Sequence, residues 1–351
     1  MIFVEADKIG SVVSKLELQR QLAVEGERRG ARVGDAVVVR ALTDSATYNQ
    51  LELPSGRLAK INPGDVLVGA LGRRRALKGF VGDVPETVGA GDRLHLLNMG
   101  GVIGCCTGHH SSLSDAIEVE VIGFVCGEDS RVRNISDAAL APRESLPDGC
   151  APLVLIAGAC MNSGKTYAAT EIVRQATRAG MRVAAAKLSG VACLRDTLHM
   201  ADHGAVATAS FLDAGLPSTV GVGDLAPVAK TIIANLNESE PDLIVIELGD
   251  GILGGYSVES VFDDAELRAA TAALVFCASD YVGAWGGIEL FRRRGIEVDL
   301  VAGSVTDSKM GEDYIEREFG VPAGNAKRNG ARLFELVKSK VESACAQAAS
   351  V

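Results

Sequence analysis

Residues 153–170, LVLIAGACMNSGKTYAAT, constrain the fold of this 351-residue chain more than any other stretch. An apolar run typical of a buried strand passes into small and polar residues, and a helical pattern begins at Lys165. A phosphate-binding loop needs this succession, with backbone N–H groups in the turn, a lysine for the outer phosphates and a hydroxyl for Mg²⁺. Lys165 and Thr166 supply the last two. The alternative is a simple turn before a helix, with an exposed lysine.

Apolar strand patterns and helical patterns alternate throughout the chain after residue 151. We predict strands at PLVLIA, RVAAAK, DLIVIEL, AALVFCA and EVDLVAG, and helices over 165–179, 225–237, 284–294, 309–319 and 328–348. Such alternation implies βαβ crossovers. The predicted fold is α/β, a mostly parallel P-loop NTPase sheet with helices on both faces.

The first part of the chain has a different pattern of apolar segments and turn residues. After a predicted helix over residues 14–30, short β segments are separated by turns rich in Gly, Asp and Pro, which is typical of a small barrel or sandwich. Residues 126–151 are polar and contain prolines. We therefore predict a mostly β N-terminal domain over 1–130, a linker over 131–150 and the P-loop NTPase domain over 151–351.

Composition narrows the classes of partner. The net charge of −10 argues against nucleic acid as a partner, and no apolar run reaches the roughly 18 residues of a membrane span. The start of the chain lacks the pattern of a secretion signal, and eight scattered cysteines fit reduced thiols. We expect a cytoplasmic protein that binds neither nucleic acid nor membrane.

The loop resembles that of the dethiobiotin synthetase family of P-loop enzymes, with cobyrinic acid diamide synthases and the P-loop protein of molybdopterin-guanine dinucleotide biosynthesis. It shares their longer spacing from Gly158 to Gly164, and two later segments, VAAAKLSG and LIVIELGDG, resemble the family's second-strand lysine and third-strand acidic residue. Ala159, Cys160, Leu188 and Leu248 depart from the family pattern. The resemblance covers the second domain and implies a homodimer.

The motif and the resemblance together assign a set of site residues. We predict nucleotide contacts from residues of the loop and the following helix start: Gly158, Asn162, Ser163, Gly164, Lys165, Thr166 and Tyr167. The bound group is a nucleotide triphosphate with Mg²⁺, whose charge needs an ammonium and hard oxygen ligands. Metal ligands are predicted at Thr166, Glu247 and Asp250, and catalytic roles at Lys165, Lys187 and Glu247.

Residues 190–219 follow the second strand and are expected to lie over the same crevice. The resemblance implies that Ser189 faces the substrate. We predict that a small acidic or amino substrate binds to Arg195, Asp196, His199, Asp202 and His203, with acid–base catalysis or metal binding by these residues as the alternatives. A solvated helix face produces the same spacing of Arg195, His199 and Asp202. Both interpretations stay open.

Three further segments have weaker signals. Cys105, Cys106, His109 and His110 invite a zinc site, although adjacent cysteines in a strand face opposite sides. Arg73, Arg74, Arg75 and Lys78 either receive an anion or solvate a hairpin. The segment VAGSVTDSK, with Ser304, Thr306 and Asp307, is expected to contact the nucleotide base, and the absence of Asn-Lys-x-Asp favours ATP over GTP.

Two classes of function remain. The first is an ATP- and Mg²⁺-dependent enzyme, a ligase or kinase, that activates a small acidic or amino substrate by phosphoryl transfer. The second is a nucleotide-binding accessory or switch protein that acts on a partner protein or cofactor; an acyl transferase on the same fold is a third outcome. Lys187 and the histidine-bearing segment after it favour the enzyme, because a switch does not require them.

Overall fold

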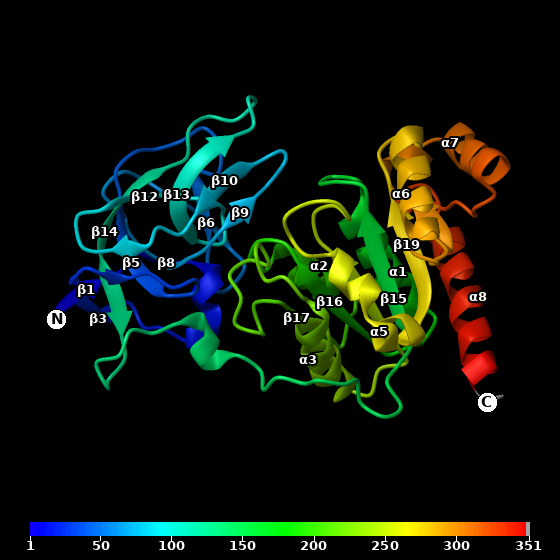
Figure 1. The fold of residues 1–351 in the computed structure, drawn as a ribbon, viewed down its shortest axis with the longest axis horizontal. Helices are drawn as coiled ribbons and strands as arrows, with labels where there is room; N and C mark the ends of the chain where they lie inside the picture. Colours follow the sequence, from blue (N-terminus) through cyan, green and yellow to red (C-terminus); the bar gives the residue numbers. More distant parts are fainter. Residues whose placement is uncertain (349–351) are drawn as a thin grey trace. The chain divides into compact units, whose positions relative to one another are not determined.

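The computed structural model describes residues 1–348, which form two compact units (Figure 1). The first unit contains Met1–Ala141 together with Val191–Arg195 and Phe211–Val220. The second contains Pro142–Gly190, Asp196–Ser210 and the chain from Gly221 onward. The chain therefore leaves the second unit after Gly190, returns at Asp196, and leaves again for residues 211–220.

The second unit is built on a parallel sheet with the strand order β17-β16-β18-β15-β19-β20. The strands are β15 (Leu153–Gly158), β16 (Val183–Ser189), β17 (Ala207–Ser210), β18 (Leu243–Leu248), β19 (Thr271–Cys277) and β20 (Leu300–Ala302). The helices are α1 (Lys165–Arg178), α2 (Arg195–Asp202), α3 (Ala226–Asn237), α4 (Glu259–Asp263), α5 (Ala265–Ala270), α6 (Tyr281–Arg293), α7 (Lys309–Tyr314) and α8 (Gly330–Ala348). This arrangement confirms the predicted α/β class.

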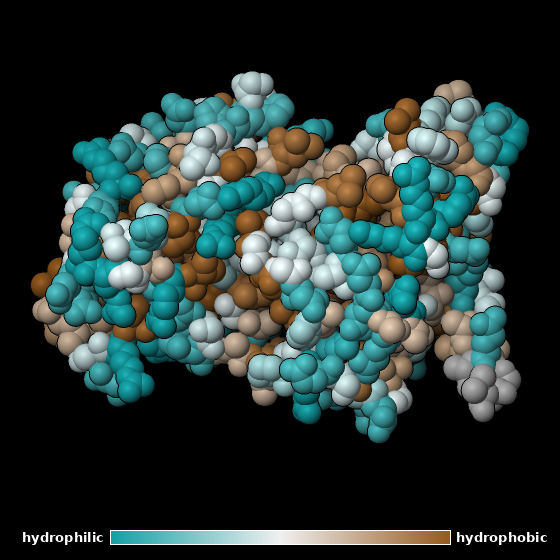
Figure 2. Space-filling view, in the orientation of Figure 1, coloured by the Kyte–Doolittle hydropathy of each residue, from teal (hydrophilic) through white to brown (hydrophobic). Residues whose placement is uncertain are grey.

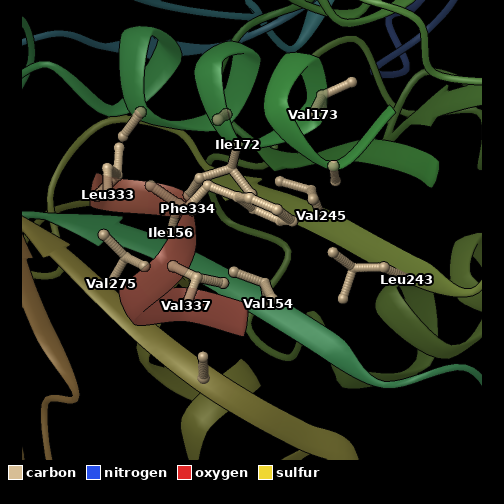
Figure 3. Packing of buried hydrophobic residues seen from close by; sticks show 14 of the residues in the cluster. Val154, Ile156, Ile172, Val173, Leu243, Val245, Val275, Leu333, Phe334 and Val337 are labelled. Carbon is tan, nitrogen blue, oxygen red and sulfur yellow. The ribbon is translucent and has the colours of Figure 1, made fainter. Parts of the chain in front are cut away.

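Helices cover both faces of this sheet because alternate residues of each strand point to opposite sides. On one face, α1 and α8 pack against the strands (Figure 3). The labelled side chains there are Val154, Ile156, Ile172, Val173, Leu243, Val245, Val275, Leu333, Phe334 and Val337. On the other face Phe276 of β19 meets Phe291 of α6, with ring centroids 5.8 Å apart. Each such buried side chain stabilises the fold by roughly 1.5–3 kcal/mol.

The first unit is mostly β, as predicted, and its central strands close into a small barrel. Strand β12 pairs with both β13 and β14, so the ladder β14-β5-β8-β13 returns to itself. The strands of the whole first unit are β1 (Ile2–Glu5), β2 (Lys8–Ile9), β3 (Gln21–Glu25), β4 (Arg29–Gly30), β5 (Ala36–Ala41), β6 (Gln50–Glu52), β7 (Leu58–Lys60), β8 (Val66–Leu71), β9 (Arg74–Arg75), β10 (Phe80–Asp83), β11 (Thr87–Val88), β12 (Arg93–Leu96), β13 (Val102–His109) and β14 (Glu118–Cys126). Alternate residues of the barrel strands, such as Val37, Val39 and Ala41, fill its interior.

The helix predicted over residues 14–30 is wrong. The chain forms a short 3₁₀ helix, Ser11–Leu16, that ends at Glu17 in the left-handed conformation, and then strand β3. Leu22 and Val24 alternate with less buried neighbours, and β3 pairs with β1 and β14. Pairing within the sheet therefore outweighed the helical propensity of this segment.

No helix among residues 1–348 is long and apolar enough to cross a membrane. Figure 2 shows hydrophilic and hydrophobic side chains interspersed over the visible face.

Candidate functional site

The loop between β15 and α1 is shaped by residues with little or no side chain. Gly164 precedes the helix with φ of 101°, a conformation that only glycine adopts freely, and Asn162 has φ of 62°. A Cβ on Gly158 would lie 2.5 Å from Ser163 Oγ and 2.9 Å from Lys165 Cδ. The missing side chain of Gly158 therefore leaves the space in which Lys165 folds back over the end of the strand.

Lys165 is held inside this loop. Its side chain is 5% exposed, and Nζ donates hydrogen bonds to the Cys160 carbonyl oxygen at 2.9 Å and to Ser163 Oγ at 3.5 Å. Burial lowers the pKa of Lys165, and the negative charge of Glu247 acts in the opposite direction. The ammonium group is thus poorly solvated and would gain from an anionic partner.

Thr166 and Glu247 face each other from neighbouring elements. Glu247 lies near the end of β18, beside Ile156 of β15, and accepts a hydrogen bond from Thr166 Oγ1 at 3.0 Å. It is 2% exposed, and its second oxygen, Oε2, has no hydrogen-bond partner among residues 1–348. Burying a carboxylate oxygen with no partner is unfavourable unless a cation or a hydrogen-bond donor binds to it. These oxygens fit the ligand chemistry of Mg²⁺.

The glycine turn after β18 packs against the loop. A Cβ on Gly251 would lie 2.6 Å from the Ala159 carbonyl oxygen, and the Ile252 amide donates to the Gly158 carbonyl at 2.9 Å. Asp250, in the left-handed conformation with φ of 64°, lies close enough for its charge to raise the pKa of Lys165. The structure therefore gathers the predicted residues Lys165, Glu247 and Asp250 at one end of the sheet.

Lys187 lies on β16 opposite Glu247 of β18 and forms an ion pair with Asp196 at the start of α2. Both side chains are largely buried, with 14% and 8% of their areas exposed. Ser189 is fully buried, and its hydroxyl donates to the Gly249 carbonyl at 3.0 Å. The structure therefore joins Lys187 to Asp196, whereas the hydroxyl of Ser189 connects β16 to the glycine turn.

The remaining predicted substrate residues are more dispersed. Arg195, His199 and Asp202 are exposed on α2. His203 Nδ1 lies 2.6 Å from the His199 carbonyl oxygen. The adjacent Gly204 carbonyl accepts a hydrogen bond from Thr177 Oγ1, in the last turn of α1. Along α1, Thr177 lies about 18 Å from Lys165, at a rise of 1.5 Å per residue. The structure therefore does not bring His203 to the loop.

A shallow pocket adjoins the loop on the side of β20. It is lined by Gly164, Tyr167, Gly303, Ser304, Asp307, Asn325, Ala326 and Lys327. Asn325 fixes Asp307 by donating to its Oδ1 at 2.9 Å, and Lys327 Nζ lies 4.6 Å from the centre of the Tyr167 ring. Sequence reasoning named Ser304 and Asp307 but missed Asn325 and Lys327, because no motif marks the segment that contains them.

Two exposed apolar side chains flank the loop. Val282 is the second residue of α6 and precedes Gly283, where an added Cβ would lie 3.6 Å from Ala159 Cβ. Leu253 follows Ile252 of the glycine turn. Val282 is 77% exposed and Leu253 is 64% exposed. Both side chains therefore belong to segments that pack beside the loop.

The cysteine and histidine segment of the first unit does not form a cluster suited to metal. His109 Nε2 lies 3.2 Å from Asp115, and His110 Nδ1 lies 2.8 Å from Ser112 Oγ. Within residues 1–348, no group of three or more His, Cys, Asp or Glu side chains is arranged to hold a metal ion. The side chains of this segment instead make local polar contacts.

The basic segment of the first unit forms a short hairpin. Arg74 and Arg75 make up β9, which pairs with β10, and Arg75 forms an ion pair with Asp83 at 2.6 Å. Arg74 is 5% exposed and donates to the Leu97 carbonyl and, at 3.1 Å, to the Tyr48 hydroxyl. Only part of this segment is therefore a solvated basic face.

No protein-family model and no curated protein sequence matches the chain. Among solved structures, it resembles the signal recognition particle 54 kDa protein of Aeropyrum pernix K1 in complex with GDP, at 16% identity over 56% of this chain and 50% of that chain, with a TM-score of 0.35. It also resembles the signal recognition particle receptor FtsY of Elizabethkingia anophelis, at 16% identity over 59% and 70%, with a TM-score of 0.35. A DUF1611 family protein from Anabaena variabilis matches at 15% identity over 57% and 63%, with a TM-score of 0.39.

The chain thus spans half the length of the first of these structures. The P-loop NTPase fold of the second unit is evident in its own parallel sheet and in the strand, loop and helix of residues 153–178. The finer resemblance to dethiobiotin synthetases, and the homodimer that it implies, stay predictions.

Proposed function

We propose that this protein is an enzyme that uses ATP and Mg²⁺ to activate a small acidic or amino substrate by phosphoryl transfer. The observation that carries the proposal is a pair of buried charged groups at the loop. A buried ammonium, Lys165, lies near a buried carboxylate, Glu247, whose second oxygen has no partner among the described residues. A magnesium–triphosphate complex would supply the anion and the cation that these two groups lack.

Different residues at the loop would bind the phosphates and the metal ion. Lys165 would exchange the Cys160 carbonyl for phosphate oxygens, and the N-terminal end of α1 adds the favourable partial charge of a 14-residue helix. Thr166 and Glu247 would hold Mg²⁺, directly or through water, with Asp250 nearby. The metal, when bound, neutralises phosphate charge as the phosphoryl group is transferred.

Lys187 is the group best placed to act on the acceptor side. It extends from the strand next to Glu247, and its ammonium group forms an ion pair with Asp196. A positive charge at this position would stabilise negative charge that develops on the transferred phosphoryl group. A pure nucleotide switch does not require such a group, and this favours the enzyme over the accessory protein.

The pocket lined by Tyr167, Asp307 and Lys327 would receive the nucleotide base. The ring of Tyr167 and the stem of Lys327 offer apolar surface, and Asp307, fixed by Asn325, offers an acceptor. The exocyclic amino group of adenine can donate to this acceptor, as can the N1–H and amino groups of guanine. The absence of Asn-Lys-x-Asp is what favours adenine. We therefore propose ATP as the nucleotide, with GTP as the competing ligand in the test.

The experiment is calorimetric titration of Mg·ATP and Mg·GTP into the wild-type protein and Lys165→Ala. Lys338→Ala is the matched control, because Lys338 is a half-exposed lysine of α8 that pairs with Glu342 within the same helix. We expect Lys165→Ala alone to abolish binding. ADP release is then measured against a panel of small amino and carboxylic acids. Absence of nucleotide binding by the wild type would refute the proposal, and hydrolysis stimulated only by a protein would favour the switch.

A further inference from the structure

Glu52 of β6 is a fully buried carboxylate whose partners lie mostly in a distant part of the sequence. It accepts hydrogen bonds from the Cys193 thiol at 3.0 Å, the Leu194 amide at 2.7 Å and the Arg195 amide at 3.0 Å. Ser11 donates a further hydrogen bond from its hydroxyl. All these residues belong to the first unit, which includes residues 191–195.

A second set of contacts fixes the same segment. Asn98 Nδ2 donates to the Ala192 carbonyl at 2.6 Å, and the Ala192 amide donates to the Pro217 carbonyl at 2.9 Å. A Cβ on Gly100 would lie 2.0 Å from the Ala192 carbonyl oxygen, so only glycine permits this close approach. Several backbone groups of the segment are therefore hydrogen-bonded within the first unit.

The carboxylate of Glu52 acts at the start of a helix. Helix α2 runs from Arg195 to Asp202, and its first N–H groups have no partner within the helix. Glu52 supplies that partner to Arg195, and its negative charge suits the positive end of the helix. The first turn of α2 therefore depends on a side chain about 140 residues earlier in the sequence.

The residue that follows Arg195 is Asp196, the partner of Lys187. We propose that Glu52 is a positioning residue, which fixes the start of α2 and thereby holds the Asp196 carboxylate against Lys187. The importance of this pair for phosphoryl transfer rests on the proposed function.

The test uses Glu52→Gln, which keeps the shape of the side chain but removes its charge and one acceptor. The matched control is Asp35→Asn. Asp35 is also fully buried in the first unit, where it accepts from Asn134 at 2.9 Å and pairs with Arg32, away from residues 191–195. Ser11→Ala, which removes one donor to Glu52 and leaves its charge, is the milder variant if Glu52→Gln does not fold.

Two readouts report on the pair without any nucleotide. The first is hydrogen exchange of the backbone amides of residues 192–200. The second is the rate at which an amine-acetylating reagent modifies Lys187, followed by mass spectrometry. In Glu52→Gln we expect both rates to rise about tenfold or more, because a hydrogen-bonded buried charge is lost. Asp35→Asn should leave both rates as in the wild type.

The proposal is overturned if Lys187 acetylation is unchanged in Glu52→Gln, or if Asp35→Asn accelerates it equally, which would indicate general loosening of the fold. Mg·ATP binding is measured in parallel and should stay within about twofold of the wild type, because the loop around Lys165 is untouched. A wild type that binds no nucleotide would refute the proposed function, yet the acetylation result would still decide the role of Glu52.

Discussion

Replacing Thr166 by valine tests the pairing of the loop with Glu247. Valine keeps the branched shape of threonine but removes the hydroxyl that donates to Glu247 Oε1 at 3.0 Å. Oε2 already has no partner among residues 1–348, so after the substitution neither oxygen of the buried carboxylate accepts a hydrogen bond from a side chain of the loop. Loss of a hydrogen bond to a charged group costs about 1.5–3 kcal/mol. For a domain of this size that lowers Tm by roughly 3–12 °C.

The assay combines thermal unfolding without nucleotide and titration of ATP with and without Mg²⁺. Thr166→Val should unfold earlier and lose the increase in affinity that Mg²⁺ provides. Thr166→Ser, which retains the hydroxyl, should preserve both properties. The reasoning is refuted if Thr166→Val unfolds at the wild-type temperature, since Glu247 would then not depend on this hydrogen bond. An unchanged effect of Mg²⁺ in Thr166→Val would remove Thr166 from the metal site.

Three further predictions concern the same loop. Burial lowers the pKa of Lys165, so ATP affinity should be constant below that pKa and fall as the pH rises through it. The fall should begin at a lower pH than the 10.5 of a free lysine, and an affinity that stays flat up to that pH would contradict the prediction. Iodoacetamide should modify Cys160 more slowly when Mg·ATP is bound, whereas the exposed Cys345 should react equally with and without nucleotide. Gly303→Ala should abolish nucleotide binding or disrupt the fold of the loop. The new Cβ would lie 2.1 Å from the Ser163 carbonyl oxygen, and the backbone φ of 92° disfavours any residue but glycine. An alanine variant with wild-type ATP affinity and Tm would show that the loop can move aside.

The sequence predicted the second unit well because its signals are local. The apolar run before Lys165 and the helical pattern after it correspond to β15 and α1, and Glu247 lies near the end of a strand as its apolar context predicted. Strand β17 was missed because ATAS has no large apolar side chain. Its burial comes from its neighbour β16, which a single sequence does not reveal.

The site was predicted less completely because several of its relations are not local. Lys187 and Asp196 were both named, but as separate groups facing a substrate, whereas the structure pairs them. Glu52 gave no signal, since an isolated glutamate in a short β segment is normally solvated. Its burial depends on donors from residues 193–195. Asn325 and Lys327 were missed for the same reason, because folding brings their segment to Asp307 and Tyr167.

The division of the chain has a consequence for how the protein is made. The first unit contains residues 191–195 and 211–220, so it cannot be completed when residue 141 leaves the ribosome. About 80 further residues must be synthesised, which takes roughly 4–16 s at usual rates of translation. Until residues 193–195 are synthesised, the carboxylate of Glu52 lacks their three hydrogen-bond donors. A truncated chain that ends before residue 190 would remain in that state permanently.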